Sequence, residues 1–390
     1  MLLTDDHRAV QDAVRAYVQD CIAPHAAAWD KSREFPRAAL RGLAALGCYG
    51  IAVPTQWGGA GLDYLALAII IEEIAAGDGA TSTIVSVNNC PVASILLAWG
   101  SEAQKQAWLK PIARGDWLGA FCLTEPHAGS QADALTTTAR LVQGTSGVGG
   151  VGGVGEHYVL NGVKQFITSG RNGDVAIVLA VTDKAAGKKG ISAFIVPTNT
   201  PGYRVARLED KLGQHASDTA QIAFENCCVP AANRIGDEGQ GLKIALSGLE
   251  GGRIGIAAQS VGMARAAFEA ALRYAKDRVT FGKPIFEHQA VQFRLADMAT
   301  QIEAARQLIH HAASLKDAGV ACLKEAAMAK LFASEMAERV CSAAIQVFGG
   351  YGYVSDFPVE RIYRDVRVCQ IYEGTSDVQK ILIGRALARE

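Results

Sequence analysis

The spacing of apolar residues changes twice along this chain, and these changes limit the folds that it can adopt. Over residues 1–118 the apolar positions recur with a helical period, whereas residues 119–230 form short runs rich in β-branched and aromatic residues. Long alanine-rich helical patterns then return. A chain of 390 residues also exceeds the size of one hydrophobic core. The sequence therefore predicts an α+β multidomain protein with an all-α domain at 1–118, a β domain at 119–230 and a helical domain at 231–390.

The central block is predicted to be an antiparallel β domain. Asn161-Gly162, which separates residues 158–160 from 163–167, is a pair typical of a two-residue hairpin turn. Residues 144–155 are nearly a Gly/Val repeat and are interpreted as a flexible hairpin tip, because a phosphate-binding loop would require a helix after it. Six segments have the composition of strands, namely 118–123, 136–142, 158–168, 175–181, 191–196 and 219–224.

Charge and cysteine content narrow the expected partners and location. The 38 Lys and Arg residues nearly equal the 39 Asp and Glu residues, so no net positive field favours nucleic acid. The longest apolar stretch, residues 65–71, is far shorter than the roughly 18 residues of a membrane span, and the N-terminal pattern is unlike an export signal. Nine cysteines are scattered without metal-site spacing. We therefore expect a cytoplasmic protein with reduced thiols, no metal and no membrane span.

The C-terminal segment 346–379 concentrates glycines, aromatic residues and paired charges, a combination typical of a binding site. Within it, Glu373 follows Ile371-Tyr372 and precedes Gly374, so its carboxylate lies where a helical pattern breaks into a turn. Burial there would raise the pKa of the carboxyl group and suit it to act as a general base. An exposed or helix-capping glutamate would have the same local pattern, so other motifs have to decide.

These other motifs resemble one enzyme family along almost the whole chain. The pattern QxFGGxGY followed by PVERxxRDxRxxxIYEGT resembles the C-terminal signature of the acyl-CoA dehydrogenases. Residues 123–130 (LTEPHAGS) resemble the TEPxAGS segment of the family, and residues 166–168 resemble its W-I-T flavin strand. Three further matching segments, 211–219, 252–257 and 274–289, follow in family order.

The resemblance implies a fold, a cofactor and an assembly. The expected fold has an N-terminal helical domain, a central antiparallel β-barrel or sandwich and a C-terminal four-helix bundle, in agreement with the segmentation of the sequence. FAD would bind between the β domain and the C-terminal helices. A neighbouring subunit of a homotetramer would reach part of the dinucleotide.

The resemblance also implies roles for individual residues. Glu373 would be the catalytic base, and Ser130, Arg253 and Gly374 would contact the acyl-CoA substrate. The residues implied to contact FAD are Phe121, Leu123, Thr124, Phe166, Thr168, Arg278, Phe281, Gln289, Gln346, Gly349, Gly350, Thr375 and Asp377.

Among these residues, Arg278 and Phe281 match positions that meet the pyrophosphate and adenosine. Gln289 and the turn at 346–350 match positions supplied by an adjoining subunit. The chain departs from common family members at Phe166, which replaces a frequent Trp, and at Asp377, where Gln is common.

A subset of the family places its base immediately before the arginine equivalent to Arg253. That position is Gly252 here, and Glu250 lies two residues earlier, where the turn of a helix would direct it elsewhere. Glu373 is therefore the expected base, and Glu250 is the next candidate.

The implied reaction is α,β-dehydrogenation of a short or branched-short acyl-CoA to a trans-2-enoyl-CoA, in fatty acid or branched-chain amino acid catabolism. The α-proton would go to Glu373, the β-hydrogen would leave as hydride to the flavin, and an electron-transferring flavoprotein would then accept the electrons. Two alternatives use the same fold: an acyl-CoA or nitroalkane oxidase, of which the latter carries Asp at the base position, and a flavin-free acyl-CoA-binding or scaffold protein.

Overall fold

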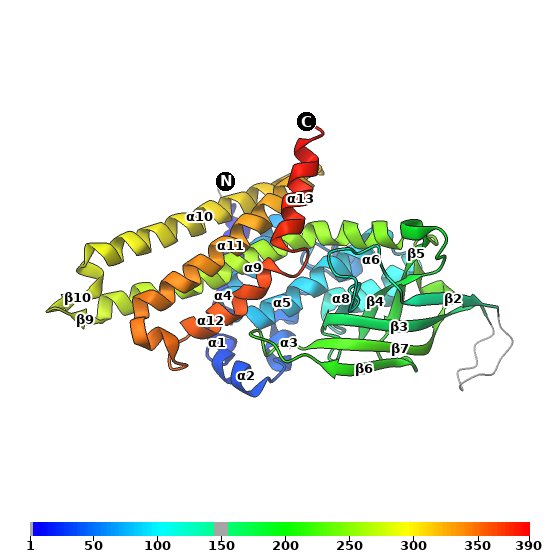
Figure 1. Ribbon diagram of the computed structural model, residues 1–390, viewed down its shortest axis with the longest axis horizontal. Helices are drawn as coiled ribbons and strands as arrows, with labels where there is room; N and C mark the ends of the chain where they lie inside the picture. Colours follow the sequence, from blue (N-terminus) through cyan, green and yellow to red (C-terminus); the bar gives the residue numbers. More distant parts are fainter. Residues whose placement is uncertain (1–2, 144–154) are drawn as a thin grey trace.

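The N-terminal region of the computed structural model, which describes residues 3–143 and 155–390, consists of helices (Figure 1). They are α1 (Asp5–Cys21), α2 (Ala26–Ser32), α3 (Arg37–Ala45), η1 (Thr55–Trp57), α4 (Tyr64–Gly77), α5 (Gly79–Val87), η2 (Asn88–Ala93), α6 (Ser94–Trp99), α7 (Glu102–Gln104), η3 (Lys105–Leu109) and α8 (Lys110–Arg114). Thr4, Asp63 and Asp78 cap α1, α4 and α5 by accepting backbone N–H hydrogen bonds. These side chains satisfy backbone donors that the first helical turn leaves without partners.

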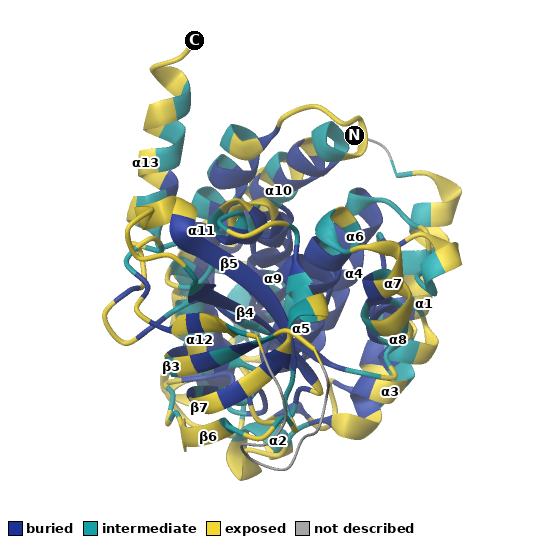
Figure 2. Cartoon of the chain, turned by 90° about the vertical axis from the view of Figure 1, so that its right-hand side faces the viewer, coloured by how far each residue is buried: buried dark blue, intermediate teal, exposed yellow. Residues whose placement is uncertain are grey.

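A sheet of eight strands follows (Figure 1). The strands are β1 (Gly119–Cys122), β2 (Thr138–Val142), β3 (His157–Thr168), β4 (Val175–Val181), β5 (Ile191–Pro197), β6 (Tyr203–Leu208), β7 (Thr219–Pro230) and β8 (Arg234–Ile235). Their order is β6-β7-β3-β2-β4-β5-β8, and β1 pairs with β4. Most neighbours are antiparallel, but β1 runs parallel to β4, and β2 meets β4 in parallel at Thr138 and Val181. Figure 2 shows β4 and β5 buried along most of their length.

The hairpin predicted at Asn161-Gly162 is wrong, because β3 continues through both residues and pairs with β7 on either side of them. The pair lies instead at a register shift, where the Asn161 side chain accepts a hydrogen bond of 2.8 Å from the Asn226 N–H. A Cβ atom at Gly162 would lie 2.5 Å from Thr137 Oγ1. Glycine is therefore needed here for a bulge and a close backbone approach, two further uses of glycine within strands.

The connection between β2 and β3 contains the Gly/Val repeat. These strands pair antiparallel as far as Val142 and His157. The predicted hairpin tip at residues 144–155 lies almost entirely outside the described residues, which resume at 155.

Sequence patterns did not indicate β6 and β8. Five of the six residues of β6 are exposed, so no alternation of apolar and polar residues marks this edge strand. β8 contains two residues, and β7 extends six residues past the predicted end at 224.

Long helices dominate the C-terminal region. It contains α9 (Gly241–Asp277), β9 (Val279–Thr280), β10 (Lys283–Pro284), η6 (Ile285–Glu287), α10 (Gln289–Asp317), α11 (Leu323–Phe348), η7 (Gly349–Tyr353), α12 (Val359–Val366), η8 (Arg367–Gln370) and α13 (Ser376–Leu387). Helices α9, α10 and α11 pack along one another, and α4 from the N-terminal region packs along α9. A helix from the N-terminal region therefore packs onto the C-terminal bundle.

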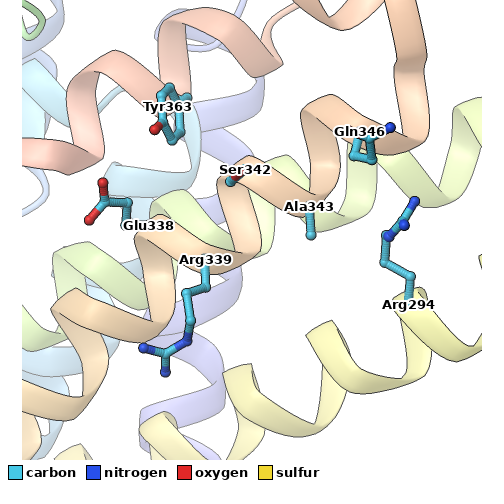
Figure 3. Close-up of a pocket in the computed structure, with 7 residues that line it drawn as sticks. All are labelled: Arg294, Glu338, Arg339, Ser342, Ala343, Gln346 and Tyr363. Atoms are coloured by element: carbon cyan, nitrogen blue, oxygen red, sulfur yellow. The ribbon is translucent and has the colours of Figure 1, made fainter.

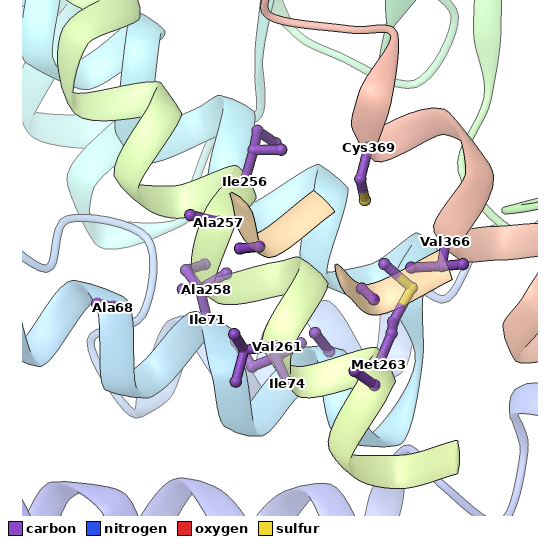
Figure 4. Packing of buried hydrophobic residues seen from close by; sticks show 14 of the residues in the cluster. Ala68, Ile71, Ile74, Ile256, Ala257, Ala258, Val261, Met263, Val366 and Cys369 are labelled. Carbon is purple, nitrogen blue, oxygen red and sulfur yellow. The ribbon is translucent and has the colours of Figure 1, made fainter. Parts of the chain in front are cut away.

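The packing of α4 against α9 forms much of the main hydrophobic core. Figure 4 shows Ile71 and Ile74 of α4 beside Ala258 and Val261 of α9. The residues of α4 are apolar on nearly every side, as a helix enclosed by other elements requires.

The segment Gly79–Trp99 is the one part of the described chain that is long and apolar enough for a membrane span. Of its most apolar window, 83% is buried inside the protein. Cys90 has a non-helical backbone (φ −136°, ψ 118°), which interrupts the helix. Burial in the core explains this apolar composition.

Candidate active site

The candidate base Glu373 lies in a tight turn between η8 and α13. Its backbone is left-handed (φ 52°), and Gly374 after it has φ 90°. Both carboxylate oxygens are buried, and neither has a hydrogen-bond partner among the described residues. A strained backbone and an unpaired buried carboxylate both cost free energy, and such features cluster at functional sites.

The backbone of α9 faces this carboxylate. A Cβ atom at Gly252 would lie 2.0 Å from Glu373 Oε2. A larger residue at position 252 would therefore displace the base. The carboxylate of Glu373 therefore lies beside residue 252, which is the alternative base position considered from the sequence.

Burial raises the pKa of Glu373 to about 7, although the positive charges of Arg253 and Lys330 oppose this rise. Arg253 is 5% exposed, and its Nε and Nη1 atoms have no hydrogen-bond partner among the described residues. Burial lowers the pKa of Arg253. The site therefore contains a carboxylate that can accept a proton near neutral pH and an arginine with unused donors.

Glu250, the next candidate, is already engaged. Its Oε1 lies 3.0 Å from Lys316 Nζ and accepts a weak hydrogen bond from Cys322. An ion-paired carboxylate is a poorer proton acceptor than an unpaired one.

Two side chains that the sequence analysis missed hold the turn. Lys330 of α11 donates a 2.7 Å hydrogen bond to the Gly374 carbonyl. Gln379 of α13 donates to the carbonyls of Glu373 (3.2 Å) and Gly374 (2.9 Å). A lysine on an otherwise apolar helical face, in line with Ala326 and Ala333, was the available signal for Lys330.

Tyr372 anchors the other side of the turn in a buried polar network. Its hydroxyl donates to Gln259 Oε1 of α9 and lies 3.5 Å from Thr83 Oγ1 of α5. Thr83 in turn donates to Gln214 at 2.6 Å. The residue before the base is therefore tied to two other regions of the chain.

The candidate flavin residues of the β region lie at the end of β1 and in β3. Phe121 belongs to β1, Leu123 and Thr124 follow it, and Phe166 and Thr168 belong to β3. The Thr124 carbonyl accepts a backbone hydrogen bond of 2.8 Å from the N–H of Gln165, so these two segments are neighbours.

Phe166 is conspicuous in this group. It is 62% exposed and has a left-handed backbone (φ 59°) within a register shift of β3. An exposed aromatic ring at a strained position fits a site that stacks against a planar ligand.

A buried ion pair joins the same two segments. Lys164 Nζ donates to Glu125 Oε1 at 2.8 Å and to the Leu123 carbonyl at 3.0 Å. Glu125 Oε2 also accepts hydrogen bonds from the backbone and the side chain of Thr136.

The remaining candidates, in the loop after β1 and at the start of α13, differ in their surroundings. Ser130 is exposed in the loop after β1. Thr375 caps α13 through its hydroxyl, which accepts a 3.3 Å hydrogen bond from the Val378 N–H. The side chain of Asp377 is 88% exposed. The FAD contact predicted for Asp377 has no further structural support.

The other candidate flavin residues lie at the opposite end of the helical bundle from the sheet (Figure 1). Phe281 is 95% exposed between β9 and β10, and Gln289 begins α10. Arg278, Gly349 and Gly350 line a groove of about 610 Å³.

Gln346 lines a neighbouring groove of about 480 Å³, where Figure 3 shows Arg294 of α10 extending toward it. Apart from Thr375 and Asp377, the flavin candidates of one chain therefore form two separated groups. We call the candidates at β1 and β3 the β group and those at the opposite end of the helical bundle the far group.

Both groups fit FAD chemically, each with a different part of it. In the β group, Phe166 offers an exposed ring beside the neighbouring backbone of Thr124. In the far group, the guanidinium of Arg278 suits a pyrophosphate, and Cβ atoms at Gly349 and Gly350 would meet nothing within 4 Å, which leaves room for a ligand.

Three family models match the chain in succession. They describe the N-terminal domain (residues 4–116), the middle domain (120–227) and the C-terminal domain (239–388) of acyl-CoA dehydrogenases. The mitochondrial short-chain specific acyl-CoA dehydrogenase of Homo sapiens is 45% identical, over 99% of this chain and 91% of that protein.

Solved structures agree with these matches. The butyryl-CoA dehydrogenase of Megasphaera elsdenii has a TM-score of 0.93 at 41% identity, with all of both chains covered. A chain from a structural study of the electron transferring flavoprotein of Acidaminococcus fermentans has a TM-score of 0.94 at 44% identity, again with all of both chains covered.

Proposed function

Because this chain belongs to the acyl-CoA dehydrogenase family of FAD-dependent oxidoreductases, we propose that it dehydrogenates short-chain acyl-CoA thioesters to trans-2-enoyl-CoA. The observation that carries the proposal is the Glu373 carboxylate, which is buried, unpaired and raised in pKa to about 7. The similar proteins are named as short-chain specific and butyryl-CoA dehydrogenases, which supports the short acyl group.

In the proposed mechanism, Glu373 removes the α-proton of the thioester. The α C–H bond breaks, its electron pair forms the new C=C bond, and the β-hydrogen leaves as hydride. FAD, when bound, supplies the two-electron acceptor for that hydride. Burial of Glu373 makes its carboxylate a stronger base than an exposed one. Arg253 lies close enough to influence the charge of Glu373, and its unused donors are available to the acyl-CoA.

The surroundings of the base also support a short acyl group. A Cβ atom at Gly251 would lie 2.9 Å from Tyr64 Cε1 and 3.0 Å from Cys90 Sγ. These side chains therefore leave little space beside α9, one residue from Gly252, against which the base lies. Straight and branched short chains differ by a methyl group, which changes binding by only about 1–3 kcal/mol. We propose a straight short chain as the preferred substrate and a branched short chain as the alternative.

The separation of the two flavin groups supports a homo-oligomer, and we propose a homotetramer in which one chain supplies the β group and a second chain supplies the far group. We further propose that a cytoplasmic electron-transferring flavoprotein accepts the electrons. The similar chain from the flavoprotein work supports that partner.

The deciding experiment is anaerobic mixing of the flavin-loaded protein with acyl-CoAs from propionyl to palmitoyl, including isobutyryl and isovaleryl. Flavin bleaching that is fastest with butyryl-CoA is expected. Fastest bleaching by a branched member would select the alternative substrate, and no bleaching by any thioester would refute the proposed function. Repeating the turnover in air separates a dehydrogenase from an oxidase, because only the oxidase would turn over rapidly with O₂ alone.

A further inference from the structure

The backbone conformation of Glu373 requires support from outside its own turn. Non-glycine residues rarely adopt a φ of 52°, and Gly374 continues the left-handed path with a φ of 90°. Such a turn persists only where surrounding groups over-determine it. The groups that hold its carbonyls are Lys330 and Gln379, which come from α11 and α13.

Burying the charged side chain of Lys330 at this site costs free energy. Its side chain is 0% exposed, and its one hydrogen bond among the described residues goes to the neutral Gly374 carbonyl. No carboxylate of the described residues forms an ion pair with it within 4 Å, although a buried ammonium normally has such a partner. If the fold needed only a hydrogen-bond donor to the Gly374 carbonyl, a neutral group such as the amide of Gln379 would be enough.

We propose that Lys330 is a positioning residue for the dehydrogenation, whose ammonium group holds the Gly374 carbonyl and thereby fixes the Glu373 carboxylate against Gly252. The inference rests on the proposed role of Glu373. It extends that role by separating the group that takes the proton from the group that keeps it in place.

The charge of Lys330 has a second, electrostatic consequence. Glu373 faces Arg253 of α9, Lys330 of α11 and Cys90 of η2, and the two cations stabilise its anionic form. Burial lowers the pKa of Lys330 itself to about 8, so that it is charged over the acid limb; Cys369, Glu373 and Glu335 oppose this fall, and Arg253 adds to it. Removing the Lys330 charge would therefore raise the pKa of Glu373, because one of its two cations would be lost.

The test uses the flavin-loaded enzyme with Lys330→Met, which keeps most of the side-chain volume and loses both the donor and the charge. The expected result is a fall in kcat of about tenfold or more, with the acid limb of the kcat/KM profile moved upward by about one pH unit. Lys324→Met is the matched control, since Lys324 lies on the same helix and pairs with Glu325 and Glu390 at the surface. Unchanged kcat and an unchanged acid limb in Lys330→Met would overturn the proposal.

Gln379→Met separates positioning from charge and serves also if Lys330→Met does not fold. It removes the hydrogen bonds to the Glu373 and Gly374 carbonyls but retains the ammonium group of Lys330, so kcat should fall while the acid limb stays in place. An acid limb that moves equally in Gln379→Met would overturn the electrostatic part of the proposal. Lys330→Gln provides a second neutral variant in which the acid limb should move as in Lys330→Met.

Failure of this inference can be distinguished from failure of the proposed function. If Glu373→Gln is inactive and both variants of Lys330 behave like the wild type, only the role of Lys330 is wrong. If Glu373→Gln retains full activity, the base lies elsewhere and the role of Lys330 falls with it, whereas the proposed dehydrogenation is refuted only if no thioester bleaches the flavin.

Discussion

Glu125 in the β region and Glu373 before α13 are both buried carboxylates near a lysine, but they differ in the hydrogen bonds that they accept. Glu125 accepts hydrogen bonds from Lys164, Thr136 and Thr137, and these partners lower its pKa to about 2 although burial alone would raise it. Glu373 has no hydrogen-bond partner among the described residues, and burial raises its pKa to about 7. Burial therefore makes a carboxylate reactive only where hydrogen-bond donors are withheld from it.

The largest expected effect is on catalysis. Glu373→Gln should lower kcat by about 10² to 10⁴-fold, because the amide cannot accept the α-proton, and should leave FAD content unchanged. Turnover with butyryl-CoA and the flavin absorbance of the purified protein measure the two quantities. The same change at Glu250, which pairs with Lys316, should retain most activity. The opposite ranking of the two variants would show that Glu250, and not Glu373, is the base.

The corresponding effect at Glu125 is on stability. Glu125→Leu leaves the Lys164 ammonium buried without its carboxylate, and breaking a buried ion pair from one side costs about 3–5 kcal/mol. Thermal unfolding of the flavin-loaded protein should show a markedly lower midpoint. The double variant Glu125→Leu with Lys164→Met should recover part of the loss, since no unpaired charge remains. No recovery would mean that the charges themselves do not dominate at this site.

The pH dependence of stability should have opposite signs at the two sites. The folded pKa of Glu373 lies above its ordinary value of 4.5, so this residue costs stability as pH rises from 4.5 through about 7. Glu373→Gln should therefore be more stable than the wild type by about 1–3 kcal/mol near pH 8 and by little below about pH 4.5. Thermal midpoints at both pH values check this, and a variant that is less stable near pH 8 would contradict it.

For Glu125 the folded pKa is lowered to about 2, so the stability that it contributes is present above its ordinary value of 4.5. That contribution is lost as pH falls toward 2. The difference in thermal midpoint between wild type and Glu125→Gln should therefore shrink at acid pH, whereas an increase at acid pH would reverse the assignment.

An exposed ion pair tests whether pairing stabilises the protein without burial, and the expected change in thermal midpoint is small. Glu225 pairs with Arg204 at 2.5 Å, but both side chains are more than half exposed. Exposed pairs are screened by water and contribute little. Glu225→Gln should therefore leave the thermal midpoint unchanged within error, and a loss comparable to that of Glu125→Leu would show that pairing matters without burial.

The sequence predicted more of the architecture than of the site. The change in apolar spacing was enough to place the sheet between two helical regions, as the structural neighbours confirm. Local pattern failed where tertiary contacts decide the backbone. Asn161-Gly162 has hairpin chemistry, but the close approach of Thr137 makes it a bulge, and the exposed edge strand β6 has no pattern to read.

In the site, motifs directed attention to Glu373, while the groups that hold it came from helices far away in sequence. Lys330 lies 43 positions before Glu373 on α11, and no local motif connects them. The withheld hydrogen bonds that distinguish Glu373 from Glu125 are likewise a property of packing and cannot be read from neighbouring residues.

The glycines of α9 beside the base have a consequence for local stability. Gly248, Gly251, Gly252 and Gly255 lie in mid-helix, and each favours a helix less than alanine by about 1 kcal/mol. This part of α9 is therefore held in a helix by packing against its neighbours, which are Ile95, Tyr64, Glu373 and Ser86. Its amide protons should exchange with solvent sooner than those of the alanine-rich turns that follow. Slower exchange on addition of acyl-CoA would make these four glycines a direct reporter of an occupied site.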